Sequence, residues 1–113
     1  MRFLRRLLPG LAVAAVAAGS FTPAFAGTVT AAVAANFTKV AEQLGADFMA
    51  ATGNDVQFSF GATGALYTQI TQGAPFDLFL SADDKRTATA IKDGFGVEGT
   101  DFTYAVGKVV LYS

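Results

Sequence analysis

Strand-like and helix-like segments alternate along residues 27–113. Small, β-branched or alternating apolar residues predict strands at residues 28–35, 55–60, 76–81 and 102–113, the last as one strand or as two broken near Gly107. Apolar residues at helical spacing predict helices at residues 37–52, from beyond Gly64 to Gly73, and at 82–94. Such an alternation calls for parallel strands joined by right-handed helical crossovers. We therefore expect a three-layer α/β lobe, with a mostly parallel sheet and helices on both faces.

Local signals place the ends of these elements. Asn36 stands where a helix N-cap belongs, and Gly53 and Gly73 fit the glycine position that follows a helix. Asp83 is expected to cap the third helix rather than to contact an anion, which its charge would repel. The strand at 76–81 is largely apolar, which predicts a central place in the sheet.

The first 26 residues have the pattern of a secretory signal peptide. Three arginines precede an apolar stretch at residues 7–18, and Ala24-Phe25-Ala26 forms a small-x-small cleavage site. A membrane anchor is the alternative, but the apolar stretch is shorter than the roughly 20 residues that span a bilayer. We expect cleavage after Ala26 and a periplasmic location. No cysteine follows that site, so a lipoprotein anchor is not expected.

Composition narrows the chemistry of the remaining 87 residues. They contain five basic and nine acidic residues, a net charge of −4 that argues against binding nucleic acid. The chain has neither cysteine nor histidine, which excludes disulfides, thiol chemistry, the usual zinc sites and a Ser-His-Asp triad. No base stands beside a nucleophile in the sequence. We therefore predict a binding protein, not an enzyme, and no cofactor.

Two short turns are the candidate binding site. Residues 34–38 (AANFT) and 61–64 (GATG) each follow a strand and open a helix, so helix N-termini with free N–H groups would converge at one sheet edge. The Asn36 amide and the Thr63 hydroxyl would add side-chain donors, and Ser81 falls at a third strand end. Neither turn contains lysine or arginine, which predicts a neutral cradle for a small anion. The alternatives are an ordinary helix cap at Asn36 and a tight connection at Gly61 to Gly64.

Four segments carry a resemblance to a known family. These are AVAANFT at 32–38, SFGATG at 59–64, GAPFDLFLSAD at 73–83 and FTYAVGKVVLYS at 102–113. In order and spacing they resemble the periplasmic molybdate-binding proteins of bacterial ABC importers. The third segment is shared with related anion and metal receptors, and the other three point toward molybdate and tungstate.

The resemblance implies a two-lobed class II periplasmic-binding fold that clamps the oxyanion between its lobes. Residues 27–113 would be the first lobe, in a fragment truncated at the crossover to the second. Asn36 takes the position of the family's Ser or Asn ligand, with backbone contributions from Ala35 and Phe37. Thr63 replaces a serine and keeps its hydroxyl, with Ala62 and Gly64 beside it. The partners implied are a membrane permease with its ATPase, and we expect a monomer.

Three other hypotheses stay open. The first is a receptor for sulfate or another small solute, which competition binding would separate from molybdate. The second is an exported α/β enzyme that acts on phosphate esters. The third is a non-binding fragment, which would expose apolar surface from Val106 to Leu111.

Overall fold

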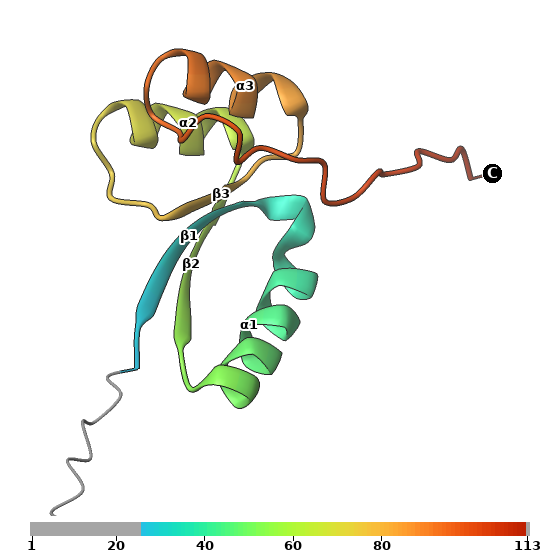
Figure 1. Cartoon of the computed structure of the whole chain (residues 1–113). Coiled ribbons are helices and arrows are strands. Elements are labelled where there is room, and N and C mark those ends of the chain that lie inside the picture. Colours follow the sequence, from blue (N-terminus) through green and yellow to red (C-terminus); the bar gives the residue numbers. More distant parts are fainter. Residues whose placement is uncertain (1–25, 113) are drawn as a thin grey trace, which may run out of the picture.

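The computed structural model describes residues 26–112, so the predicted signal peptide lies outside the described residues except for Ala26. Within them, strands and helices alternate as the sequence predicts (Figure 1). The strands are β1 (Thr28–Ala34), β2 (Asp55–Gly61) and β3 (Leu78–Leu80). The helices are the 3₁₀ turn η1 (Ala35–Phe37), α1 (Thr38–Thr52), α2 (Thr63–Thr71) and α3 (Asp84–Lys92).

The three strands form one parallel sheet in the order β2-β1-β3. α1 connects β1 to β2 on one face of the sheet, whereas α2 and α3 lie together on the other face (Figure 1). This arrangement confirms the predicted α/β lobe with helices on both faces. The chain passes from β1 through α1 to β2, and then from β2 through α2 on the other face to β3. The carboxyl ends of β1 and β3 therefore form a topological switch point, where α/β sheets bind ligands.

The core lies around β1, whose residues 31–34 are buried. α1 and α2 both pack against this strand, one from each face, and its small side chains let them approach closely. The strand predicted to be central, at 76–81, is instead the short strand β3 at an edge of the sheet. That prediction was wrong because the apolar residues of a strand indicate that helices cover its faces. They do not indicate how many strands lie beside it. Leu78 in β3 is half exposed.

The start of the first helix also differs from the prediction. Asn36 lies inside η1, and the residue that precedes α1 is Phe37, with no side-chain cap. The chain tightens into one 3₁₀ turn before the α-helix begins, and the Thr38 hydroxyl donates to the carbonyl of Ala35 at 2.8 Å. A tight first turn satisfies terminal backbone groups locally, so no side-chain cap forms there. The Asn36 amide is therefore exposed and does not serve as a helix cap.

The other helix boundaries follow the sequence signals. Gly53 and Gly73 adopt φ values of 74° and 91°, which favour glycine, directly after α1 and two residues beyond α2. Asp83 caps α3 as predicted, because its Oδ1 accepts the N–H of Arg86 at 2.9 Å. That hydrogen bond is the main reason why the pKa of Asp83 lies below its usual value.

A carboxylate fastens β3 to the central strand. Asp77 Oδ2 accepts hydrogen bonds from the N–H and the hydroxyl of Thr30, both at 2.9 Å. In return the N–H of Asp77 donates to the carbonyl of Thr30 at 2.8 Å. The hydrogen bonds from Thr30 lower the pKa of Asp77. Asp77 therefore anchors the loop that precedes β3 to Thr30 of β1, and so sets the position of β3.

The strand predicted at 102–113 does not form. Residues 102–112 have no regular secondary structure and are exposed, and Ser113 lies outside the described residues. A strand gains its stability from a hydrogen-bonded neighbour, and no described strand lies alongside this segment. One anchor holds its beginning, where the Tyr104 hydroxyl donates to the carbonyl of Ser81 at 3.1 Å. Among residues 26–112, every helix is too short or too polar to cross a membrane.

Candidate functional site

The register of the sheet brings the two predicted turns together. Ala34, the last residue of β1, pairs with Gly61, the last residue of β2. The turns that begin at Ala35 and Ala62 therefore start side by side at one edge of the sheet. η1 and α2 open directly from them, so both present backbone N–H groups at this edge. The predicted convergence of two helical N-termini is thus present in the structure.

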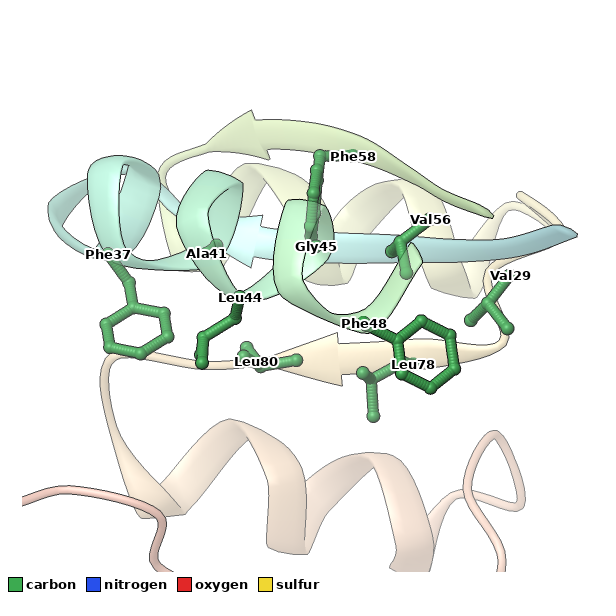
Figure 2. Close-up of a pocket in the computed structure, with 10 residues that line it drawn as sticks. All are labelled: Val29, Phe37, Ala41, Leu44, Gly45, Phe48, Val56, Phe58, Leu78 and Leu80. Carbon is green, nitrogen blue, oxygen red and sulfur yellow. The ribbon is translucent and has the colours of Figure 1, made fainter. Parts of the chain in front are cut away.

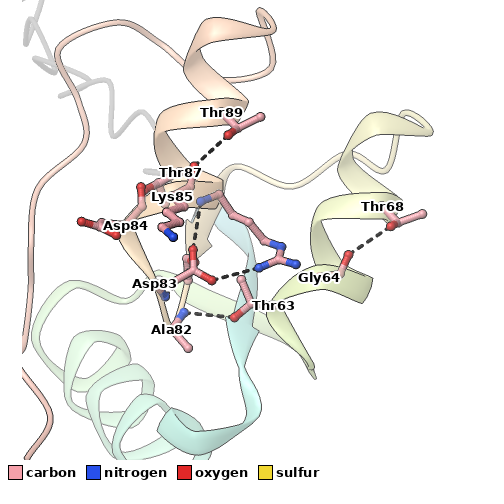
Figure 3. A network of polar contacts seen from close by, with 11 residues as sticks. Thr63, Gly64, Thr68, Ala82, Asp83, Asp84, Lys85, Thr87 and Thr89 are labelled. Carbon is pink, nitrogen blue, oxygen red and sulfur yellow. Dashed lines mark hydrogen bonds and ion pairs between the residues drawn. The ribbon is translucent and has the colours of Figure 1, made fainter.

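Thr63 is the most strongly positioned of the predicted residues. It is the first residue of α2, its side chain is buried, and its Oγ1 accepts the N–H of Ala82 at 3.0 Å (Figure 3). This hydrogen bond joins the second turn to the chain that leaves β3. A threonine hydroxyl that accepts one hydrogen bond still has a proton to donate. Thr63 is therefore a fixed donor at the carboxyl edge.

Ser81 lies next to this point, at the end of β3. Its side chain is buried, and its Oγ accepts the N–H of Asp83 at 3.1 Å. The ring of Tyr104, whose hydroxyl holds the carbonyl of Ser81, stands against Phe37 of the first turn with 5.1 Å between ring centroids. The ends of β1 and β3 are thus bridged by one aromatic side chain, at the switch point.

The charge around the second turn differs from the sequence expectation. The turns themselves contain no cation, but α3 brings Arg86 to Gly64: a Cβ built on that glycine would lie 3.1 Å from Nη2. The guanidinium is paired with Asp83, with 3.0 Å between Nη1 and Oδ2. The cradle is therefore neutral in its own residues but is bordered by an ion pair.

Two cavities offer other possible ligand sites. One is a groove of about 260 Å³ between α1 and the sheet, and Figure 2 shows its lining. The lining residues are all apolar or glycine: Val29, Phe37, Ala41, Leu44, Gly45, Phe48, Val56, Phe58, Leu78 and Leu80. The other, of about 430 Å³, lies between β3 and α3, and the residues that line it include Asp77 and Asp101. Neither suits an anion, which needs hydrogen-bond donors in place of its lost water.

Cation binding has little support in the described part of the chain. Residues 26–112 contain no group of three or more acidic residues that could hold a metal ion. The two turns supply backbone N–H groups, the Thr63 hydroxyl and the exposed Asn36 amide, and the Asp83–Arg86 ion pair borders them. A set dominated by donors fits an anion.

Two residues at this edge, Ala82 and Arg86, could not have been identified from a sequence motif. Ala82 offers only a backbone N–H, which any residue type would supply, and its contact with Thr63 spans 19 residues. Arg86 lies on a helix surface, where a solvated side chain is the ordinary interpretation. Only the packing of α3 against α2 places it beside Gly64.

The chain belongs to the bacterial extracellular solute-binding proteins, since residues 29–113 match the sequence pattern of that family. The molybdate-binding protein ModA of Rhodobacter capsulatus is 53% identical over 112 residues, which cover 99% of this chain and 44% of that protein. ModA of Azotobacter vinelandii is 50% identical over 88 residues, covering 78% of this chain and 35% of that protein.

A solved structure matches the fold as well. The periplasmic molybdate-binding protein of Azotobacter vinelandii superposes with a TM-score of 0.69 at 41% identity, over 71% of this chain and 35% of that one. The chain thus spans less than half the length of the relatives that it matches. The family is one of binding proteins, which agrees with the expectation that the protein is not an enzyme.

Proposed function

We propose that this protein captures molybdate or tungstate outside the cytoplasmic membrane, as the binding component of an ABC importer. The observation that carries the proposal is the pairing of Ala34 with Gly61, which sets the two turns side by side. Relatives named for molybdate binding support the choice of anion. The oxyanion would bind Asn36 and Thr63, with backbone contributions from Ala35, Phe37, Ala62 and Gly64.

The chemistry of these donors suits a tetrahedral dianion. Molybdate and tungstate at neutral pH have only acceptor oxygens, so a site made of donors satisfies every one of them. Protonated phosphate would leave its O–H without an acceptor, and a buried unsatisfied donor costs about 1–3 kcal/mol. Sulfate has the same charge in a smaller volume, so the size of the site must discriminate against it.

The position of the site suits capture by closure. The donors lie at the edge of the lobe, where a second lobe would cover the anion by a hinge motion. The closed form would then dock on a membrane permease driven by an ATPase. Export by the predicted signal peptide, with cleavage after Ala26, would place the monomeric protein in the periplasm.

Two alternatives remain for the same edge. A sulfate receptor would use the same donors, and the anion panel below separates it from a molybdate receptor. A phosphate-ester hydrolase would need a base next to a nucleophile. The buried hydroxyls of Thr63 and Ser81 instead accept backbone N–H groups, of Ala82 and Asp83.

The deciding experiment is titration calorimetry on residues 27–113, with molybdate, tungstate, sulfate and phosphate. Circular dichroism first establishes that the purified chain has its helices. We expect heat from molybdate and tungstate, and none from sulfate and phosphate at the same concentrations. A folded chain that binds sulfate alone would identify a sulfate receptor. If the folded chain binds none of the four, the same panel is run on the chain extended by its downstream sequence, and silence there would overturn the proposal.

A further inference from the structure

We propose that Arg86 and Asp83 set the affinity of the anion site, with Arg86 attracting the dianion and Asp83 weakening that attraction. This inference rests on the proposed function, because it concerns the same site. It assigns a role to an ion pair that lies outside both predicted turns. The role is electrostatic, and neither residue needs to touch the anion.

The guanidinium of Arg86 lies at the entrance of α2, and its side chain is 46% exposed. The Cβ that Gly64 lacks would lie 3.1 Å from Arg86 Nη2, 3.5 Å from Cζ and 3.6 Å from Nε. The whole guanidinium therefore faces the second residue of the helix, in space that a larger residue would occupy. A cation would ordinarily be disfavoured there, because the helix N-terminus is the positive end of the helix dipole. An anion at that terminus would relieve this repulsion.

Asp83 holds the guanidinium in place and offsets its charge. Each carboxylate oxygen has a different partner in Arg86. Oδ1 accepts the backbone N–H at 2.9 Å, and Oδ2 pairs with Nη1 of the guanidinium at 3.0 Å. Asp83 follows Ala82, whose N–H meets Thr63, so the negative charge also lies close to the proposed site (Figure 3). A dianion thus meets one favourable and one unfavourable charge.

Removal of the charge of Asp83 and removal of the charge of Arg86 should change the anion affinity in opposite directions. Asparagine is as good an N-cap as aspartate, so Asp83→Asn keeps the cap while it removes the negative charge and the ion pair with Arg86. Arg86→Gln removes the cation and leaves the carboxylate facing the anion. If Asp83 served only to cap α3, Asp83→Asn would leave the affinity for molybdate unchanged.

The test is molybdate titration of the full chain and of five variants at low and at moderate ionic strength. We expect Arg86→Gln to bind about tenfold more weakly and Asp83→Asn about three- to tenfold more tightly, the scale expected for one nearby unit charge. The double variant should return to within about threefold of the parent, because it restores a neutral border. Arg86→Lys should restore most of the affinity. Added salt should weaken the parent more than Arg86→Gln.

Lys92→Gln is the matched control, since it removes the same charge from the other end of α3. Circular dichroism and a thermal melt of each variant separate a loss of fold from a loss of affinity. If the parent binds molybdate and Arg86→Gln matches Lys92→Gln, the inference is wrong while the proposed function stands. Weaker binding by a folded Asp83→Asn would also overturn it. A folded parent that binds no molybdate, both by itself and when extended by its downstream sequence, overturns both.

Discussion

Replacement of Thr63 by valine tests the site at its most strongly positioned residue. Valine has nearly the same shape, so the change removes an oxygen and leaves the buried space filled. The N–H of Ala82, which Thr63 Oγ1 accepts at 3.0 Å, loses its partner. Because Ala82 is itself exposed, water can replace that acceptor, and the free energy of unfolding should fall by only about 1 kcal/mol. For a domain of this size that lowers the melting temperature by about 4–8 °C.

The effect on binding should be larger than the effect on stability. A hydrogen bond to a charged ligand is worth about 1.5–3 kcal/mol, so molybdate should bind about ten- to 150-fold more weakly to the valine variant. Titration calorimetry gives the affinity, and a thermal melt gives the stability. Thr63→Ser keeps the hydroxyl and should bind within about threefold of the parent.

Thr68→Val is the matched control for this experiment. Thr68 lies on the same helix, and its hydroxyl donates only to the carbonyl of Gly64 within that helix, at 3.0 Å. It is exposed and lies five residues beyond Thr63 along α2. Its loss should leave molybdate affinity unchanged. Equal affinity of folded Thr63→Val and the parent would refute the assignment of Thr63 as an anion ligand.

Two further predictions concern the framework of the lobe. Asp77→Asn should lower the melting temperature at neutral pH, because a carboxylate whose pKa is lowered by folding stabilises the fold above its ordinary pKa. The difference from the parent should shrink as the pH falls through the native pKa of Asp77, and melts across the acid range check this; a difference independent of pH would contradict it. Leu78→Lys should reduce binding of the apolar dye ANS, because Leu78 is half exposed on the edge strand β3 beside the apolar groove. Unchanged dye fluorescence would contradict this prediction.

The apolar surface predicted for a non-binding fragment is present. Val106, Val109, Val110 and Leu111 are all more than three-quarters exposed. Exposure of this segment does not decide between a binding and a non-binding chain, because the segment lies outside the turns proposed to hold the anion. The calorimetry panel makes that decision. The signal peptide, the cleavage site and the assignment of residues 27–113 as a first lobe stay predictions.

The sequence by itself determined the order of the elements and most of their ends. Hydrophobic periodicity is a local property, so it predicted β1, α1, β2, α2 and α3 close to their observed bounds. Glycine after a helix acts through its own backbone, and aspartate before one acts through a carboxylate that reaches only three residues on. Both effects are local, which is why Gly53 and Asp83 behave as predicted. The alternation also restricted the topology to a parallel sheet with helices on both faces.

The tertiary structure decided what depends on neighbours distant in the sequence. The place of β3 at an edge and the absence of a strand at 102–112 follow from which segments find a hydrogen-bonding partner. The contact of Thr63 with Ala82 and the approach of Arg86 to Gly64 join segments 19 and 22 residues apart. Periodicity carries no information about such contacts, since they arise only when the sheet sets its carboxyl ends side by side.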